Sequence, residues 1–130
     1  MSERDLGTFS PSLAVQDLAA SRAFYEALGF AVLGGDADQG WLILRSGATI
    51  LGLFQGMLEK NTLTFNPGWT GMAQPLQDFE DVRAIKARLE AAGIETQGEI
   101  DPASTGPAHF IAVDPDGNPV LFDQHVDKPR

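Results

Sequence analysis

Apolar side chains recur at helical spacing in two stretches of the chain, and each stretch lies between an aspartate and a glycine. In the second stretch, Val82, Ile85 and Leu89 fall three or four residues apart, which predicts one apolar stripe along a helix. Asp81 stands just before this stripe, where its carboxylate can accept the unpaired amide hydrogens of the first turn. Gly93 follows the stripe and predicts the left-handed residue that ends the helix.

The same arrangement occurs 64 residues earlier in the chain. The positions that match at this offset are Asp17 with Asp81 and Gly29 with Gly93. Continued upstream, the offset places Ser10 on Gln74, so we expect a strand to begin near each of them. Two copies of one pattern predict two structural modules of the same kind.

Each predicted helix is followed by enough strand-like sequence for three strands. They cover about residues 30–34, 41–45 and 48–54 after the first helix, and about 94–99, 108–113 and 119–124 after the second. The predicted fold class is therefore α+β, with two tandem βαβββ modules at about residues 8–54 and 74–124 and a linker at residues 55–73. One such module leaves a sheet face bare, so we expect the two curved sheets to pair around a cleft.

Composition limits the chain to one domain and narrows its partners. The 130 residues suit a single core, and the absence of cysteine removes disulfides and thiolate metal ligands. A net charge of −9 offers no cationic surface to phosphate backbones or anionic lipids, so we expect neither nucleic acid nor membrane as a partner. The sequence shows no signal-like or membrane-spanning segment, which makes the cytoplasm the expected location.

Two sets of residues carry a resemblance to a known family. They are Leu13, Val15, Asp17-Leu18, Phe24-Tyr25 and Leu28-Gly29-Phe30 in the first half, and Asp114-Pro115-Asp116-Gly117-Asn118 in the second. Together they resemble the vicinal oxygen chelate superfamily, which includes glyoxalase I, extradiol dioxygenases, fosfomycin-resistance enzymes and bleomycin-resistance proteins. The resemblance implies the paired βαβββ fold. It does not choose a function, because the superfamily supports lyases, isomerases, oxygenases and binding proteins.

Metal-using members of this superfamily hold one divalent ion with ligands from the first and last strands of each module. The resemblance places the following residues at those positions: Ser10, Gln74, Leu51 or Gly52, and Leu121. Of these, Gln74 alone is a plausible ligand, and a neutral amide binds divalent ions weakly without carboxylate or imidazole help. We therefore expect no cofactor, with a divalent metal as the alternative.

The two histidines of the chain leave a different metal site open. His109 and His125 would form a two-histidine, one-carboxylate set if Asp123 joined them. Asp123 and His125 are two residues apart, so they share a face if the strand continues through both. The sequence does not decide whether His109 lies near them.

The residues at the implied metal positions, together with the nearby aromatic residues, predict a metal-independent protein. It would bind a small molecule in an apolar and aromatic cleft. Ser10 and Gln74 would supply hydrogen bonds to the ligand. The walls would be formed by Trp41, Leu51, Gly52, Phe54, Trp69 and Leu121. We expect a homodimer, since such clefts are often completed across a two-fold axis in this superfamily.

Three alternatives remain open from the sequence. The protein would be a metal-dependent glyoxalase-like lyase or dioxygenase if other His or Asp residues supplied the ligands. It would be a non-catalytic interaction protein if its cleft were filled by its own side chains. The two modules would pair either within one chain or by exchange between two chains.

Overall fold

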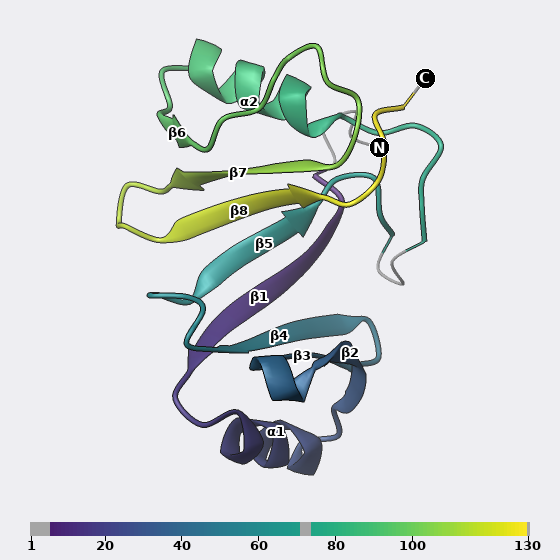
Figure 1. The fold of residues 1–130 in the computed structure, drawn as a ribbon, viewed down its shortest axis with the longest axis vertical. Helices are drawn as coiled ribbons and strands as arrows, with labels where there is room; N and C mark the ends of the chain where they lie inside the picture. Colours follow the sequence, from purple (N-terminus) through teal and green to yellow (C-terminus); the bar gives the residue numbers. More distant parts are fainter. Residues whose placement is uncertain (1–5, 71–73, 130) are drawn as a thin grey trace. The chain divides into compact units, whose positions relative to one another are not determined.

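The computed structural model describes residues 6–70 and 74–129. The described residues form eight strands, two α-helices and one 3-10 helix (Figure 1). In chain order they are β1 (Thr8–Val15), α1 (Leu18–Ala27), β2 (Ala31–Asp36), η1 (Ala37–Gln39), β3 (Trp41–Ser46), β4 (Thr49–Gln55), β5 (Thr62–Asn66), α2 (Val82–Ala91), β6 (Thr96–Gln97), β7 (Ala108–Val113) and β8 (Pro119–Gln124). The structure combines helices with strands that pair in both parallel and antiparallel fashion, which confirms the predicted α+β class.

The chain divides into two compact units. The first unit comprises residues 10–63, and the second comprises residues 1–9 and 64–130. Each unit contains one of the two helices and half of the sheet order. These boundaries differ from the predicted limits of 8–54 and 74–124, since the second unit includes residues 1–9 and its main segment begins at residue 64 rather than at residue 74.

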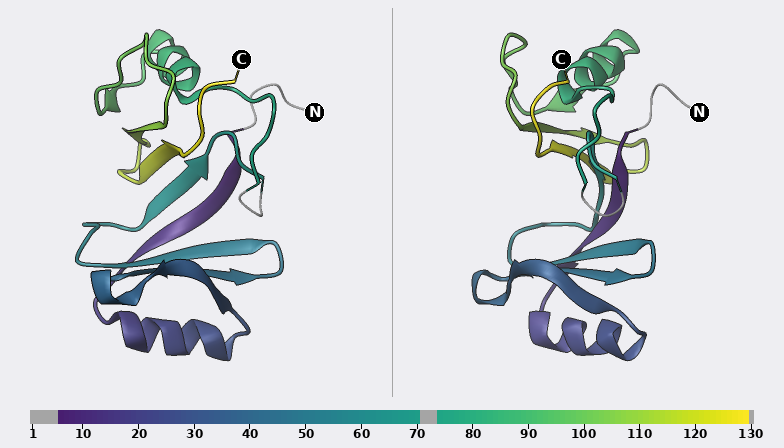
Figure 2. Two further views of the ribbon diagram at one scale, coloured as in Figure 1. Left: turned by 45° about the vertical axis from the view of Figure 1, so that its right-hand side comes forward. Right: turned by 90° about the vertical axis from the view of Figure 1, so that its right-hand side faces the viewer.

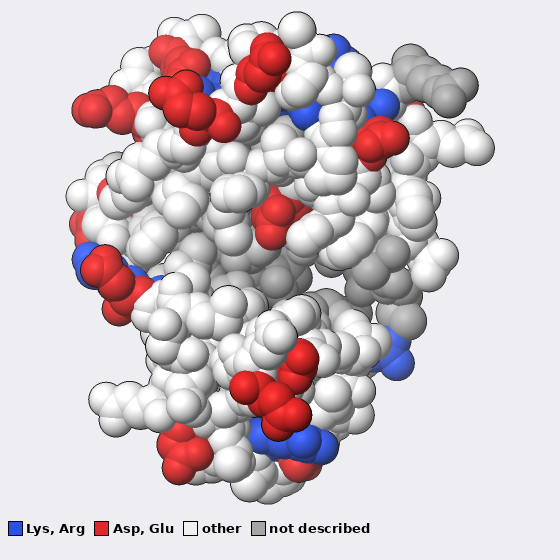
Figure 3. Space-filling view, in the orientation of Figure 1, with Lys and Arg blue, Asp and Glu red and all other residues white. Residues whose placement is uncertain are grey.

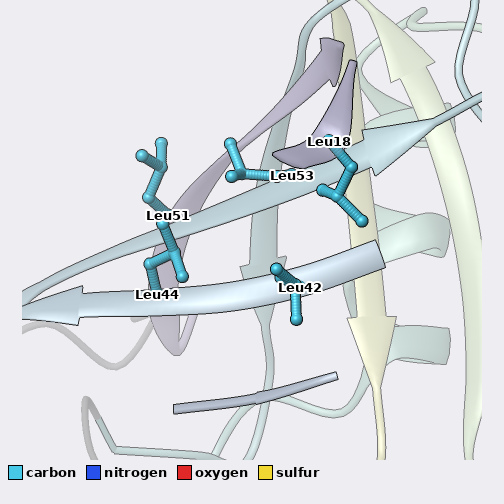
Figure 4. Packing of buried hydrophobic residues seen from close by; sticks show 5 residues of the cluster. All are labelled: Leu18, Leu42, Leu44, Leu51 and Leu53. Atoms are coloured by element: carbon cyan, nitrogen blue, oxygen red, sulfur yellow. The ribbon is translucent and has the colours of Figure 1, made fainter. Parts of the chain in front are cut away.

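In the first unit, α1 covers one face of a sheet with strand order β2-β3-β4-β1 (Figures 1 and 2). Strand β1 is parallel to β4, whereas the β2–β3 and β3–β4 pairs are antiparallel. Under the helix lies a cluster of five buried leucines, shown in Figure 4: Leu18, Leu42, Leu44, Leu51 and Leu53. Burial of this apolar surface holds α1 to the sheet.

The second unit repeats this arrangement with different side chains. Helix α2 lies along one face of a sheet with strand order β5-β8-β7-β6 (Figure 2). Its core consists of Val82, Ile85, Phe110, Ala112 and Phe122. The Phe110 and Phe122 rings stack with their centroids 4.7 Å apart, which places both on the sheet face that α2 covers.

The predicted helix ends are confirmed. Asp17 accepts a hydrogen bond from the amide of Ala20 at 3.1 Å, and Asp81 accepts one from the amide of Arg83 at 3.0 Å. The residues that follow the two helix C-caps are Gly29 and Gly93, whose φ angles are 110° and 85°. A positive φ is the left-handed conformation for which glycine carries no Cβ penalty, so both glycines stand where the helix pattern requires them.

The first strand of the second half was predicted in the wrong place. The structure places it at β5, inside the predicted linker of residues 55–73, whereas residues 74–81 form no strand. Two residues separate β1 from α1, but fifteen separate β5 from α2. The offset of 64 residues therefore holds for the helices and fails for the strands, because the connection before α2 is longer.

Candidate functional site

The strand pairing of the first unit shows which side chains turn away from α1. Trp41 lies opposite Phe54, and Ile43 lies opposite Gly52, in the antiparallel pair β3–β4. Since successive side chains of a strand point to opposite faces, these four residues lie on the face that α1 does not cover. We call this the far face of the unit and use the same term for the second unit.

Leu51 does not lie on the far face. It is buried in the leucine cluster under α1, beside Leu44 (Figure 4), so its assignment to the ligand-binding surface is corrected, and Gly52 is the β4 residue that turns away from the helix. Successive side chains of a strand point to opposite faces, so only one of Leu51 and Gly52 can lie on the far face. The sequence had left these two positions open, and the structure selects Gly52. Ser10 shares the far face, because Ser12, two residues along β1, pairs with Gly52. Ser10 is itself buried.

An aromatic ring occupies the space above Gly52. A Cβ atom at this glycine would lie 2.7 Å from Cε2 of Phe54 and 3.4 Å from Cδ1 of Ile43. The Phe54 ring also lies parallel to Trp41, with centroids 6.2 Å apart and an interplanar angle of 2°. The β4 position at which the resemblance implies a metal ligand therefore has no side chain of its own and is covered by an aromatic ring.

The far face of the second unit carries both apolar and titratable side chains. Leu121 lies opposite Ile111, and Asp123 lies opposite His109, in the antiparallel pair β7–β8. Phe122, between Leu121 and Asp123, packs under α2, which places its two neighbours on the far face. Leu121 thus lies on the face where the resemblance implies a metal ligand.

Residues 114–118, just before β8, form a turn that is stabilised by hydrogen bonds of its own side chains. The Asp114 carboxylate accepts hydrogen bonds from the amides of Asp116 and Asn118, both at 2.9 Å, and from the Asn118 side chain at 2.8 Å. These bonds, led by that of the Asn118 side chain, lower the pKa of Asp114 and keep the carboxylate ionised. The turn fixes the start of β8 and hence the register that brings Leu121 to the far face.

An aromatic and ionic cluster lies at the end of β8. His125 Nε2 lies 3.2 Å from Asp123 Oδ2. The imidazole ring stacks on Trp69, with ring centroids 4.6 Å apart and an interplanar angle of 15°. The hydrogen bond to Asp123 raises the pKa of His125, because a carboxylate partner stabilises the imidazolium form.

Asn66 forms hydrogen bonds to both backbone segments of this cluster, the one that carries Asp123 and the one that carries Trp69. Its side-chain Nδ2 donates to the main-chain oxygen of Asp123 at 2.8 Å, and its own main-chain oxygen accepts from the Trp69 amide at 3.2 Å. The Trp69 oxygen in turn accepts from the amide of Thr8 at 3.1 Å. The indole and the imidazole therefore stand on backbone segments that are hydrogen-bonded to one another.

The residues present do not fit a divalent metal at the implied positions. Leu121 offers no donor, Gly52 has no side chain, and Gln74 lies in an exposed loop segment rather than on a strand. Nor do His109, Asp123 and His125 form a ligand set, since no group of three histidine, aspartate or glutamate residues in the described ranges 6–70 and 74–129 lies close enough to hold an ion. We therefore derive no reaction step through a metal.

A separate hollow of about 640 Å³ lies at the C-terminal end of α2. The residues that line it include the apolar Leu89, Val120 and Phe122, together with Asp114. None of the residues predicted from sequence to bind a ligand lines it. It lies on the helix side of the second unit, away from the far face.

Sequence reasoning missed the stacking of His125 on Trp69. The two-residue interval between Asp123 and His125 was a usable signal, and it was read as a possible ligand pair. The indole is 56 positions away in the chain and reaches the imidazole only through the turn after β5. Nothing in the local pattern at Trp69 indicates that contact.

Each sheet has a helix on one face, a self-capped turn precedes the last strand, and three of the implied ligand positions, Ser10, Gly52 and Leu121, lie on the far faces. These features define an α+β protein of the vicinal oxygen chelate type. The chain belongs to the Glyoxalase/Bleomycin resistance protein/Dioxygenase superfamily, whose family profile matches residues 7–122. The resemblance found in the sequence is thereby confirmed.

Solved structures show the same fold. A superfamily member from Vibrio splendidus 12B01 is 18% identical, with a TM-score of 0.61, over 89% of this chain and 97% of that one. A Legionella pneumophila structure described as an NAD-dependent benzaldehyde dehydrogenase is 18% identical, with a TM-score of 0.66, over 90% and 98%. Homoprotocatechuate 2,3-dioxygenase from Arthrobacter globiformis is 22% identical, with a TM-score of 0.57, over 98% of this chain and 38% of that one. At these identities the likeness concerns the fold alone.

No curated protein matches the sequence. Among the described residues, no helix has the length and apolar character needed to cross a membrane. Figure 3 shows acidic side chains scattered over the face drawn, with wide uncharged areas between them and few basic groups. That face has no continuous basic surface.

Proposed function

We propose that this protein binds a small organic molecule, without a metal, on the far faces of its two βαβββ modules. The proposal includes pairing of the modules around a cleft, as the sequence predicts. The far face of the first unit offers a stacked aromatic pair, Trp41 and Phe54, and that of the second offers Leu121 and Ile111. Apolar and aromatic walls with a few polar groups suit a small ligand.

The observation that carries the proposal is the replacement of donors by apolar groups at the implied metal positions. Leu121 stands at one of them, and the Phe54 ring covers Gly52 at another. A carboxylate or imidazole at these places would bind a cation, whereas alkyl and aromatic groups bind an apolar ligand surface. Ser10 and Gln74 remain proposed as hydrogen-bonding groups, and Trp69 as part of the ligand surface.

A metal-dependent glyoxalase-like lyase or dioxygenase is the second candidate, and superfamily membership supports it. A protein whose cleft is filled by its own side chains is the third. A homodimer and a cytoplasmic location stay predictions of the sequence.

Metal analysis separates the first two candidates. We expect protein purified without chelator to contain far less than one equivalent of nickel, zinc, manganese or iron, and its melting temperature to be the same with and without EDTA. Stoichiometric metal, together with a fall in melting temperature on chelation, would reject the metal-independent proposal.

The Leu121→Glu variant also tests metal independence, because it introduces a metal-binding group at an implied ligand position. A carboxylate at position 121 replaces an apolar side chain and adds a second negative charge two residues from Asp123 on the same strand face, so we expect lower stability and no gain in metal affinity. The matched control is Leu121→Gln, which has nearly the same shape without the charge. A gain in affinity for a divalent ion in the glutamate variant alone would show that the ancestral metal geometry persists.

A further inference from the structure

We propose that the hollow at the C-terminal end of α2 binds a small aromatic molecule that carries a cationic group, an arylalkylamine. The hollow has a volume of about 640 Å³, and every residue that lines it belongs to the second unit. Small-molecule pockets typically measure about 300–1,000 Å³. This inference does not rest on the proposed function, because the hollow lies on the helix side of the sheet and the proposed ligand surface lies on the far face.

The first unit shows which side chains occupy the equivalent place. There the amide of Phe30 donates to the main-chain oxygen of Tyr25 at 3.1 Å, just after α1. Ile94 and Leu89 form the same bond at 3.0 Å, just after α2. The two helices thus end alike, so Leu89 and Ile94 stand where the first unit has Tyr25 and Phe30.

Two aromatic rings fill this place in the first unit. The rings of Tyr25 and Phe30 meet edge to face with their centroids 5.8 Å apart, and both pack against the leucine cluster under α1. The second unit has only aliphatic side chains at these positions, and Ile94 is 41% exposed. Both Leu89 and Ile94 line the hollow.

The sheet beneath the helix differs in the same direction. Leu51 of β4 and Val120 of β8 both lie four residues before the glutamine that ends the strand. Leu51 pairs with Leu44 on the neighbouring strand, whereas Val120 pairs with Ala112. Val120 and Ala112 line the hollow together with the ring of Phe122. Smaller side chains at four corresponding positions, two on each side of the hollow, therefore account for the open space.

The body of the ligand follows from this comparison. A ring that covers Leu89, Val120 and Phe122 removes their apolar surface from water, as the rings of Tyr25 and Phe30 do for the first unit. A cavity of about 150 Å³ lined by leucine, isoleucine and phenylalanine is large enough to bind benzene. The hollow in the second unit therefore has room for one ring and a short substituent.

The charges around the hollow select a cation. Of the described residues that line it, Glu95 and Asp114 are ionisable, and both are acidic. The hydrogen bonds within the turn lower the pKa of Asp114, so this carboxylate keeps its charge at neutral pH. An ammonium group at the edge of the hollow is attracted by both carboxylates, and an anionic group is repelled.

The experiment uses benzylamine as the probe and three compounds that each change one property. Benzyl alcohol removes the charge, benzoate reverses it, and butylamine keeps the ammonium group without the ring. Binding to the full-length protein is followed by NMR shifts of the methyl groups of Leu89, Ile94 and Val120. The methyl groups of Leu121 and Ile111 report on the far face in the same spectra.

Two variants fill the hollow with residues that the first unit has at the same places. They are Ala112→Leu and Ile94→Phe. The matched control is Val32→Phe, which adds an aromatic ring at an exposed position of the first unit. Glu95→Gln removes one charge at an exposed position and tests the selection of the cation. Circular dichroism verifies that each variant is folded.

We expect benzylamine to shift the methyl signals of the hollow in a saturable way and to leave those of Leu121 and Ile111 unchanged. Each filling variant should bind it roughly tenfold more weakly or worse, and Val32→Phe should bind it like the parent protein. Benzyl alcohol and butylamine should bind more weakly than benzylamine, and benzoate most weakly. In Glu95→Gln the difference between benzylamine and benzyl alcohol should shrink.

Four results would overturn the inference. Unchanged affinity in both filling variants would reject the hollow as the site. Equal affinity for benzylamine and benzoate would reject the selection of a cation, and equal affinity for benzylamine and butylamine would reject the aromatic body. Absence of saturable shifts in the hollow would reject the site altogether. If shifts then appear at Leu121 and Ile111, the proposed function is supported while this inference fails.

Discussion

Gln124, the last residue of β8, accepts a hydrogen bond from the amide of Val82, the first residue of α2, at 2.7 Å between Oε1 and N. Gln55, the last residue of β4, does the same for Leu18 at the start of α1, also at 2.7 Å. In each unit the final strand thus fastens the helix N-terminus, which has unpaired amide hydrogens. The two contacts differ in burial, because Gln124 is only 1% exposed and Gln55 lies at the surface.

Replacing these glutamines should have unequal effects. Gln124→Ala leaves the Val82 amide and the Asp81 carboxylate, which Gln124 Nε2 also contacts at 2.8 Å, without this partner in a buried site. We expect a loss of about 1–3 kcal/mol in the free energy of unfolding, measured by urea denaturation. Gln55→Ala should cost less, because water reaches the freed amide. Equal losses for the two variants would contradict this explanation.

The buried ion pair in the second unit should be sensitive to removal of its cation. Arg83 Nη1 lies 2.9 Å from Asp81 Oδ1, and both side chains are less than 10% exposed. Arg83→Met leaves the Asp81 carboxylate buried without its counter-ion, so we expect a loss of about 3 kcal/mol. Arg22→Met removes an exposed pair with Glu26 and should cost less than about 0.5 kcal/mol. Similar unfolding midpoints for the two variants would refute the role given to burial.

Two glycines with positive φ should respond differently to alanine. A Cβ at Gly93 meets nothing within 4 Å, so Gly93→Ala should cost only the left-handed conformation, about 1 kcal/mol. A Cβ at Gly7 would lie 2.0 Å from the main-chain oxygen of Asn66, so Gly7→Ala forces the backbone apart and should cost clearly more. Gly93→Val should exceed Gly93→Ala, because branching worsens the fit to this conformation. Thermal melts of the three variants test the order.

Gly52 should be coupled to Phe54. Gly52→Ala places a methyl group against the ring, and we expect a loss of about 1 kcal/mol together with a change in Trp41 fluorescence as the stacked pair shifts. In a Phe54→Leu background the same change should cost less, so the double-mutant cycle gives a non-zero coupling energy. Gly34→Ala is the control, since its Cβ would meet nothing within 4 Å. Strict additivity would show that the ring does not occupy this space.

The contribution of His125 to stability should depend on pH. Its pKa in the folded protein is raised above the ordinary value of about 6.5 by the hydrogen bond to Asp123. A raised pKa means that the pair contributes fully below about pH 6.5 and that this contribution is lost as the pH rises through the folded-state pKa. Asp123→Asn should therefore be less stable than the parent at about pH 5.5 and nearly equal at about pH 8.5.

Urea unfolding at the two pH values measures this difference, and an NMR titration of the His125 ring gives its pKa directly. His109→Gln is the matched control, because it removes the other histidine of the far face and leaves the Asp123–His125 pair in place. A constant difference between Asp123→Asn and the parent across the range would mean that Asp123 acts only through its main chain and its packing.

Local sequence was sufficient for the helices and for the last two strands. Caps such as Asp17 and glycines such as Gly93 act within one turn of chain, so their effect is readable from neighbouring letters. Strands β7 and β8 and the turn at Asp114 were likewise predicted at their observed places, because the turn satisfies its own hydrogen bonds. Strand β5 was not predicted, since its five residues show little alternation of apolar and polar side chains. The repeat also placed the first strand of the second half near Gln74 instead.

The sequence by itself determined the family, the helix limits and the absence of a metal-ligating side chain at position 121. Each of these depends on residue type and short spacing. Only the tertiary structure decided that Leu51 faces α1 while Gly52 turns away, that Phe54 covers the glycine, and that Trp69 meets His125. Strand pairing assigns faces across chain segments, and no local pattern contains that pairing. The contact between Trp69 and His125 exists because Asn66 joins two backbone segments that the sequence keeps 56 positions apart.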